Sequence, residues 1–503
     1  MRKALQVIIF LALVGALYFL VSDYLDRRVL GFLSILITCS VAFIGFVIFL
    51  ENRHPTQTLT WLVVLGSFPL LGFFFYIMFG RNYRKKKLFK QKAMLDEQTF
   101  LKFEGNRDSN IEKLQYIGVH QQPLLRLAHY LGKSPVSLAT ETKVLTNGMA
   151  TFSAIFDELK KARHHIHLEY YIVRHDEVGQ QLKEILISKA KEGVYVRFLY
   201  DAVGSWQLSD SYIDELRQAG VLVVPFSPVR LPFLNNKINF RNHRKIIVID
   251  GTVGFVGGLN IGDEYLGKNK YFGFWRDTHL QIKGEAVRTL QLIFLQDWYY
   301  MTGQTLLTMD YLSPKLINQS EQGGVQLIAG GPDNEWEVIK HLFFAMITSA
   351  KKSIWIASPY FIPDEDILTA IKVAALSGID VRLLVPKRPD KKIVFYASRS
   401  YFPVLLEAGV KIYEYQKGFL HSKIIIVDGE LASIGTANMD MRSFHLNFEV
   451  NAFLYHTDST KQLVKDFIQD FKDSAKIEYE RFKKRPIMIR IVESTSRLLS
   501  PLL

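Results

Sequence analysis

The stretch HRKIIVIDGTVGFVGGLN at residues 243–260 returns as HSKIIIVDGELASIGTAN at residues 421–438. The two copies align without a gap and share a histidine, a lysine, an aspartate, two glycines and an asparagine. The shared residues are His243, Lys245, Asp250, Gly251, Gly257 and Asn260 in the first copy, and His421, Lys423, Asp428, Gly429, Gly435 and Asn438 in the second. A single short motif arises by chance, whereas a second copy with the same spacing does not. We infer that the chain contains a duplicated unit.

The apolar run behind each lysine predicts a buried strand that starts at the motif. Side chains two residues apart on a strand point to the same face, so the histidine and lysine of each copy share one face. Asp250 and Asp428 have the opposite parity and stand at the strand end. A catalytic role and a structural turn role are both open for these two aspartates.

The duplication extends well beyond the motif. Residues 154–200 read as helix, strand, helix, strand, and residues 341–386 follow the same plan. An Ala-Gly-Val sequence comes next in both halves, centred on Gly220 and on Gly409. Short apolar strands that alternate with longer helices predict an α/β sandwich in each half. We place the first domain at residues 139–320 and the second at residues 321–503.

The shared face of each strand carries groups suited to phosphate chemistry. Histidine is a nucleophile and a proton carrier near neutral pH, and lysine offers positive charge to phosphate oxygens. Asn260 and Asn438 can donate hydrogen bonds to the same oxygens. A buried carboxylate would fix the tautomer of each histidine, and Asp277 and Glu449 are the candidates. Because no carboxylates crowd the motif and the chain has a single cysteine, we expect neither a metal site nor a cofactor.

Three apolar stretches open the chain, at residues 5–21, 29–50 and 58–79. The second and third carry no charge and, at about 1.5 Å per residue, are long enough to cross a bilayer. The first is either a signal peptide or a retained span, and we favour a span because no clear cleavage site follows it. The dense basic run at residues 81–92 places the chain behind it in the cytoplasm by the positive-inside rule. We therefore predict a membrane segment at residues 1–80, a basic linker at residues 81–138 and cytoplasmic domains.

The formal charge of +13 indicates an anionic partner. The basic run at residues 81–92 either attracts anionic lipid headgroups or only sets the topology. Residues 481–490 and 496–503 mix basic and apolar side chains, which fits either docking on a membrane surface or an ordinary packed tail. The first half also carries an apolar insertion at residues 227–241, which either contacts acyl chains or packs as a structural loop.

The paired motif resembles that of the phospholipase D superfamily, whose members place two such halves face to face around one shared site. Further stretches are similar to bacterial cardiolipin synthases, and the resemblance covers nearly the whole chain. They are ENRHP at residues 51–55, FGRNY at 79–83, GGLNIGDEY at 257–265 and GTANMDMRSF at 435–444. The resemblance implies an α/β protein with two tandem phospholipase D-like domains that face each other behind N-terminal transmembrane helices.

The resemblance also implies a multi-pass enzyme of the bacterial cell membrane. Such an enzyme joins two phosphatidylglycerol molecules into cardiolipin and releases glycerol, through a phosphohistidine and without a metal or cofactor. The catalytic set would be His243, Lys245, Asp250, His421, Lys423 and Asp428. We favour His243 as the nucleophile and His421 as the acid and base, although the pseudo-symmetry allows the reverse.

Other functions use the same residues. Hydrolysis by a phospholipase D and transfer to a different alcohol both stay open, because they differ only in the acceptor that reaches the phosphohistidine. A nucleic-acid substrate is disfavoured by the membrane segment and by the lack of an evident aromatic stacking platform. A scaffold without activity is disfavoured because both His-Lys pairs are intact.

Overall fold

The computed structural model describes residues 27–50, 55–67, 121–228, 239–312 and 323–503, together with Gly72, Tyr76 and Lys92. The chain forms two compact units. The smaller unit contains helices α2 and α3, and the larger unit contains every described residue from Lys92 to the C-terminus.

Two apolar helices make up most of the described part of the smaller unit, α2 (Arg27–Leu50) and α3 (Pro55–Ser67). The predicted span at residues 29–50 lies within α2, and the one at 58–79 overlaps α3. The predicted span at residues 5–21 lies outside the described residues. No helix in the described parts of the chain combines the length and the apolar character needed to cross a membrane.

The first half of the larger unit is built on a seven-stranded sheet with the strand order β1-β8-β6-β5-β2-β3-β4. Its strands are β1 (Thr140–Thr146), β2 (His165–Tyr170), β3 (Tyr195–Asp201), β4 (Leu222–Phe226), β5 (Ile246–Ile249), β6 (Val253–Gly257) and β8 (Thr278–Gly284). Its helices are α8 (Asn147–Lys160), α9 (Glu177–Lys191), α10 (Asp210–Gln218), α11 (Val287–Thr302) and α12 (Met309–Leu312). Strand β5 shows how the sheet is covered, because Ile247 and Ile249 share a core with α8, α9 and α10, whereas Ile246 and Val248 share one with α11.

The second half is built on an eight-stranded sheet with the order β19-β13-β12-β10-β15-β16-β18-β9. Its strands are β9 (Gly324–Gly330), β10 (Ser353–Ala357), β12 (Asp380–Pro386), β13 (Lys411–Tyr415), β15 (Ile424–Val427), β16 (Leu431–Gly435), β18 (Glu449–Tyr455) and β19 (Ser474–Lys476). Its helices are α13 (Val338–Ser349), α14 (Glu365–Leu376), α15 (Lys392–Arg399), α16 (Phe402–Glu407), α17 (Met441–His445), α18 (Asp458–Lys472), α19 (Tyr479–Lys483) and α20 (Ile487–Arg497). The remaining elements are α7 (Gln122–Gly132), β7 (Phe274–Arg276), β11 (Phe361–Ile362), β14 (Gly418–Leu420), β17 (Met439–Asp440), and the 3-10 helices η3 (Asp263–Leu266) and η4 (Ser500–Leu502).

The predicted duplication of an α/β domain is confirmed. From β9 to β13 the second sheet repeats the strand order of the first, and β19 adds one edge strand beside β13. The two Ala-Gly-Val sequences also serve the same purpose. Gly220 (φ 91°) and Gly409 (φ 95°) each end a helix in the left-handed conformation that glycine adopts without strain, just before an edge-side parallel strand.

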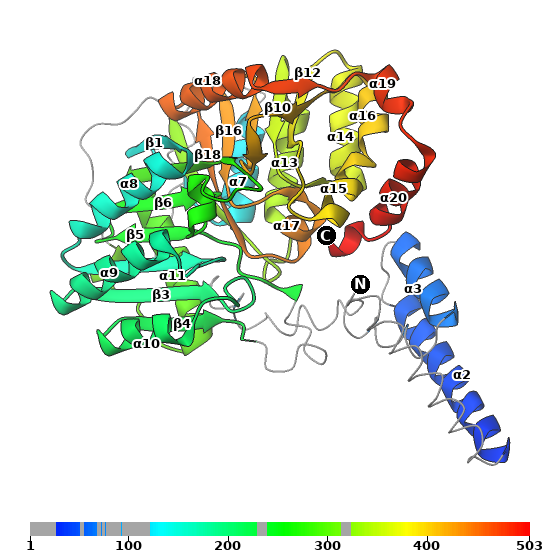
Figure 1. Ribbon diagram of the computed structural model, residues 1–503, viewed down its shortest axis with the longest axis horizontal. Helices are drawn as coiled ribbons and strands as arrows, with labels where there is room; N and C mark the ends of the chain where they lie inside the picture. The colour runs from blue at the N-terminus through cyan, green and yellow to red at the C-terminus, as the bar shows by residue number, and fades with distance from the viewer. Residues whose placement is uncertain are drawn as a thin grey trace. The chain divides into compact units, whose positions relative to one another are not determined.

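The two halves meet where β6 of the first sheet lies next to β16 and β18 of the second (Figure 1). They share one buried core and a pair of short ladders. Ile246 of β5 and Ile424 of β15 belong to the same buried cluster, so apolar residues of both motif strands pack into the junction. Strand β7 pairs in parallel with β14, and Asn242 forms an equivalent bridge with Phe448. Each ladder ends next to a motif histidine, so the fold brings both histidines to the junction of the halves.

Candidate active site

The first motif histidine lies three residues before β5, with its backbone fixed by the opposite half. The predicted strand is therefore shorter than expected, because β5 and β15 begin just after Lys245 and Lys423. The backbone N–H of His243 donates to the carbonyl of Phe448 at 2.9 Å. Lys245, which is fully buried, donates from Nζ to the carbonyl of His243 at 2.6 Å. The ring of Tyr171 meets the His243 ring edge to face, with 4.9 Å between the ring centres.

A carboxylate from the second half orients the His243 ring. Nδ1 of His243 lies 2.9 Å from Oε2 of Glu449, the first residue of β18. The Thr436 hydroxyl donates to the same oxygen at 2.5 Å, and the Asn447 amide donates to Oε1 at 3.2 Å. Glu449 is therefore held by three side chains and can face His243 in one orientation only.

The second motif histidine is held in the same manner by the first half. The backbone N–H of His421 donates to the carbonyl of Arg276 at 2.7 Å. Nδ1 of His421 lies 2.7 Å from Oδ2 of Asp277, whose Oδ1 accepts the Thr278 N–H at 2.8 Å. Lys423 donates from Nζ to the His421 carbonyl at 2.6 Å.

The two orienting carboxylates are thus exchanged between the halves. Asp277 follows β7 in the first half and serves the histidine of the second, whereas Glu449 opens β18 in the second half and serves the histidine of the first. Neither half holds a complete histidine–carboxylate pair, so the site exists only when both halves are docked.

Burial sets the ionisation of the histidines. It lowers the pKa of His243 to about 4 and that of His421 to about 4, so both rings are neutral at pH 7. Burial alone would raise the pKa of Glu449, but the attraction of His243 and Lys245 outweighs it and holds that pKa at about 2. A neutral ring that donates its Nδ1 proton to a carboxylate leaves the lone pair of Nε2 available to attack phosphorus.

Burial also brings the two motif lysines close to neutrality. It lowers the pKa of Lys245 to about 7, where repulsion by Lys423 adds to the effect and attraction by Glu449 opposes it. Burial lowers the pKa of Lys423 to about 8, where attraction by Asp277 and Glu449 opposes the effect. An anionic phosphate between them would favour the charged ammonium forms. Lys245 and Lys423 are therefore suited to hold a phosphodiester that enters a largely buried site.

Asp250 and Asp428 lie at the other end of the motif strands and bind backbone. Asp250 accepts the N–H groups of residues 163, 164 and 165 at 2.8–2.9 Å, where β2 begins. Asp428 accepts those of residues 351, 352 and 353 at 2.7–2.9 Å, where β10 begins. Both residues adopt a left-handed backbone, with φ values of 52° and 56°. Both aspartates therefore stabilise a turn away from the histidines, and this role explains why they recur at the same position in the two copies.

The two motif asparagines differ in their surroundings. Asn260 accepts the Ile172 N–H at 3.1 Å and donates to the Tyr265 hydroxyl at 3.2 Å. Asn438 is buried, and its Oδ1 has no hydrogen-bond partner in the described part of the chain. The side chain of Asn260 is thus committed to the fold, whereas that of Asn438 keeps capacity for a ligand.

Sequence reasoning missed several polar residues behind the site. Thr436 lies inside the second motif copy at the position that Gly258 occupies in the first, and that mismatch between otherwise similar copies was the available signal. Arg244 is buried, pairs with Asp297, and donates from Nε to the Glu449 carbonyl at 3.1 Å, so it ties the halves together. The pattern of apolar residues does not indicate that ion pair.

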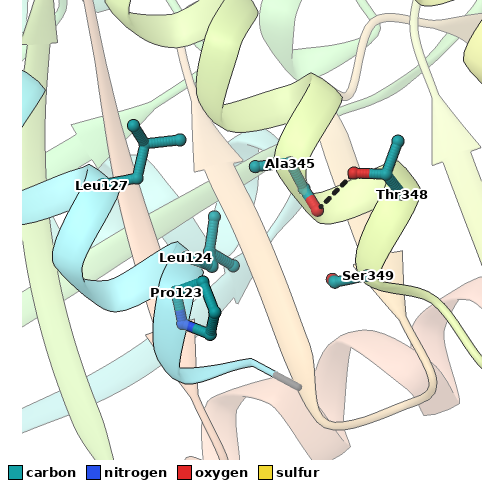
Figure 2. Close-up of a pocket in the computed structure, with 6 residues that line it drawn as sticks. All are labelled: Pro123, Leu124, Leu127, Ala345, Thr348 and Ser349. Atoms are coloured by element: carbon teal, nitrogen blue, oxygen red, sulfur yellow. Dashed lines mark hydrogen bonds between the residues drawn. The ribbon is translucent and has the colours of Figure 1, made fainter. Parts of the chain in front are cut away.

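Two further observations bear on ligands. No group of three or more His, Cys, Asp or Glu side chains in the described ranges is arranged to hold a metal ion. Figure 2 shows a small pocket between α7 and α13, lined by Pro123, Leu124, Leu127, Ala345, Thr348 and Ser349. None of these is a predicted site residue, and the pocket offers hydroxyl groups but no charged side chain, so it does not fit a phosphate.

Known proteins share this combination of motif and fold. Residues 155–298 and 343–471 match the family described as "Cardiolipin synthase, PLD-like domain", and residues 35–81 match the one described as "Phospholipase D-nuclease N-terminal". The chain belongs to the cardiolipin synthase family. A relative named "Cardiolipin synthase" from Geobacillus sp. (strain WCH70) is 78% identical over 503 residues, which cover 100% of both chains. "Cardiolipin synthase 1" from Bacillus anthracis, a more distant member, is 42% identical over 510 residues and is also covered over 100% of both chains.

A solved structure supports the fold assignment of the family. The phosphatidylserine synthase of Haemophilus influenzae Rd KW20 superposes with a TM-score of 0.56 at 16% sequence identity. The match covers 76% of this chain and 100% of that one. The tandem phospholipase D-like fold is therefore shared between proteins whose sequences have diverged widely.

Proposed function

We propose that this protein transfers a phosphatidyl group from one phosphatidylglycerol to another, giving cardiolipin and glycerol. The observation that carries the proposal is the pair of neutral, carboxylate-oriented histidines flanked by two buried lysines at the junction of the halves. Full-length similarity to relatives that are named cardiolipin synthases supports the choice of substrate.

The first step forms a covalent intermediate. Nε2 of His243 attacks the phosphorus of one phosphatidylglycerol, and the bond from phosphorus to the glycerol headgroup oxygen breaks. His421 donates a proton to that oxygen, and glycerol leaves. Lys245 and Lys423 balance the charge on the phosphate oxygens. We propose that Asn438 contributes to substrate binding through Oδ1, which can accept from a substrate hydroxyl, whereas Asn260 is left out because its amide bonds within the fold. The negative phosphate favours the protonated ring that His421 needs in this step.

The second step releases the product. The free hydroxyl of a second phosphatidylglycerol attacks the phosphorus while His421, now neutral, takes its proton. The bond between phosphorus and Nε2 of His243 breaks, and cardiolipin leaves with the histidine restored. Glu449 and Asp277 keep their rings in the required tautomer throughout.

We also propose that residues 1–80 anchor the enzyme in the cell membrane, with the two domains in the cytoplasm. Two features of the sequence support this, the charge-free runs at residues 29–50 and 58–79 and the basic run at residues 81–92. The domain limits at residues 139–320 and 321–503, with a linker at 81–138, are part of the same proposal.

The test is to incubate the purified full-length protein in mixed micelles with labelled phosphatidylglycerol and to separate the lipid products. We expect cardiolipin and glycerol in equal amounts from the wild-type protein, and neither from His243→Ala or His421→Ala. Leu376→Glu, an exposed position on α14, is the matched control and should keep activity. Phosphatidic acid as the main lipid product would instead identify a hydrolase and overturn the proposal.

A further inference from the structure

The C-terminal helix α20 buries polar side chains. Glu493 is only 1% exposed and Ser496 is buried too, although both are polar. Glu493 pairs with Arg485 at 2.7 Å and with Arg399 of α15 at 3.6 Å. Just behind the helix, the Ser500 hydroxyl lies 3.1 Å from that of Tyr401. The helix is therefore attached to the domain by ion pairs and hydrogen bonds.

The outward side of the same helix is apolar. The exposed apolar residues of the helix and of the two leucines that follow it, with their exposed fractions, are Ile487 62%, Met488 67%, Ile489 37%, Ile491 52%, Val492 41%, Leu498 80% and Leu499 40%. At about 100° per residue all of these side chains except Ile489 fall within an arc of roughly 140°, in which Thr495 is the one exposed polar residue. A helix on the surface of a globular protein normally faces the core with its apolar arc and water with its polar one. Since α20 does the reverse, its outward face is built for contact with something other than water.

The charge around this face matches an anionic surface. Residues 481–503 carry six Lys and Arg side chains and one acidic residue, and that acid, Glu493, is buried and paired. Arg490 and Arg497 are exposed and border the apolar arc on one side. An apolar arc edged by arginine is the pattern of helices that lie in the headgroup region of anionic membranes.

A second copy of the chain fits this face less well than a lipid surface does. The helix has 11 residues, so its face is about 16 Å long and of roughly 200 Å² in area. A stable interface between proteins covers about 800 Å² on each partner. The face of α20 is too small to hold two copies together by itself, whereas it is of ordinary size for an interfacial helix.

The location of α20 suits a lipid substrate. The helix packs on α15, which follows β12 (Figure 1). Strand β12 runs parallel to β10, whereas β15 runs antiparallel to it, and Ile424 at the start of β15 pairs with the last residue of β10. The carboxyl end of β12 and the start of β15 therefore lie at the same edge of the sheet, where the strands end. That edge carries His421 and Lys423. Docking of α20 on a bilayer would therefore bring the membrane surface to the active-site edge of the second half.

We propose that the outward face of α20, extended by Leu498 and Leu499, docks on the anionic membrane surface and holds the active site next to its lipid substrate. The role assigned to the substrate rests on the proposed function, whereas the docking itself rests on the inverted helix. It is a second membrane contact, separate from the anchor proposed for residues 1–80.

The test measures the depth of α20 in a bilayer, with the full-length protein reconstituted into vesicles of phosphatidylcholine and phosphatidylglycerol. In a background of Cys39→Ser, the variant Met488→Cys carries a bimane probe, and brominated phosphatidylcholine serves as the quencher. Lys351→Cys is the matched control, because Lys351 is exposed and precedes β10, at the opposite sheet edge. We expect several-fold stronger quenching at position 488 than at position 351, and weaker quenching at 488 when phosphatidylglycerol is left out.

Equal quenching at both positions would overturn the proposal. A second outcome would also overturn it. If, in detergent, the probe at position 488 becomes more protected from water as the protein concentration rises, a second copy of the chain occupies this face. If quenching occurs while the wild-type protein makes no cardiolipin, the proposed function fails and the docking stands. If cardiolipin forms without quenching at position 488, the docking alone fails.

A kinetic arm adds a readout of function. Ile491→Glu and Leu498→Glu should raise the KM for phosphatidylglycerol in vesicles by about tenfold, since a carboxylate in the headgroup region is repelled by anionic lipid. Leu376→Glu places the same charge on an exposed apolar position of α14 and should leave KM unchanged. An unchanged KM in all three variants, together with unchanged thermal unfolding, would contradict the proposal.

Discussion

The two half-sites carry the same histidine and lysine but hold their carboxylates differently. In the first half Gly258 leaves the space that Asp277 fills, since a Cβ atom at this glycine would come within 2.1 Å of Oδ1 of Asp277. In the second half the matching residue is Thr436, whose hydroxyl donates to the longer Glu449. Asp277 has a short side chain with no room beside it, whereas Glu449 has a longer side chain that accepts from a hydroxyl. Each carboxylate nevertheless reaches its histidine. Duplication preserved the chemical task while the local packing diverged.

The lysines differ as well. Nζ of Lys423 lies 3.0 Å and 3.2 Å from the two ring nitrogens of His421, whereas Lys245 lies over the Tyr171 ring at 5.5 Å from its centre. A cation close to the His421 ring opposes its protonation, and an anionic substrate that draws Lys423 away would relieve that effect. The second half therefore has the arrangement in which substrate binding can turn a neutral histidine into an acid. Lys245 also lowers the pKa of His243, so the two halves differ in degree, and the assignment of His421 as the acid and His243 as the nucleophile stays a prediction.

The largest expected effect separates the roles of the two histidines. His243→Ala and His421→Ala should each lower kcat on phosphatidylglycerol by about 10⁴ or more, because each removes a group that acts in the covalent step. On phosphatidyl-p-nitrophenol, whose leaving group needs no proton, His421→Ala should release one equivalent of nitrophenol in a rapid burst. His243→Ala should release none. A burst from His243→Ala and none from His421→Ala would exchange the two assignments.

The packing difference predicts unequal effects of two small substitutions. Gly258→Ala should lower kcat by about 10²-fold, because the new methyl group displaces Asp277 and tilts His421. Thr436→Ala removes one hydrogen bond from Glu449, which keeps its contacts with His243 and Asn447, so about a tenfold loss is expected. The measurement is steady-state kinetics, with circular dichroism as a control for folding. Equal losses in the two variants would show that the half-sites tolerate change alike.

The motif strands, the duplication and the two carboxylates were predictable from sequence because they follow from short-range patterns. Period-two alternation gave the shared face of each histidine and lysine, and repeated spacing gave the equivalent strands. Asp277 and Glu449 could be named as candidates, but their exchange between halves could not, because it depends on how two sheets dock. The buried pair of Arg244 and Asp297 was equally out of reach, since paired charges in a core have no periodic signature.

Activity should depend on pH because one group of the site must be neutral to act whereas others must be charged. The nucleophile must be neutral, so kcat/KM should fall as pH drops below about 4, the pKa of His243. The lysines must be charged to hold phosphate, and a lysine is charged below its pKa. His421 must carry a proton to act as the acid, so kcat/KM should decline as pH rises through about 4, the pKa of His421, and the decline should steepen through about 7 for Lys245 and about 8 for Lys423. A pH series in micelles of fixed composition measures this profile.

Two outcomes would refine or reject that account of the lysines. Lys423→Met should abolish the upper of the two alkaline steps and move the lower one to higher pH, because Lys423 no longer lowers the pKa of Lys245 by repulsion, together with a large rise in KM. A profile that stays flat to pH 9 in the wild-type protein would show that the burial of Lys245 and Lys423 does not weaken their charge in the working enzyme.

The smallest effect on catalysis is expected where the two halves are most alike. Asp250 and Asp428 each accept three backbone N–H groups at the start of a central strand, and neither takes part in the histidine pairs. Asp250→Ala and Asp428→Ala should each lower the free energy of unfolding by about 2 kcal/mol, because three backbone N–H groups lose a charged acceptor and the left-handed backbone disfavours alanine. Asparagine tolerates that backbone and keeps one acceptor oxygen, so Asp250→Asn should lose less.

The folded fraction of each variant should retain kcat within about tenfold, since a turn far from the histidines positions the strand but touches no substrate. Thermal unfolding and kinetics on the same samples would separate the two readouts, and a folded Asp250→Asn protein with kcat reduced by 10³-fold or more would place this aspartate among the reacting groups after all.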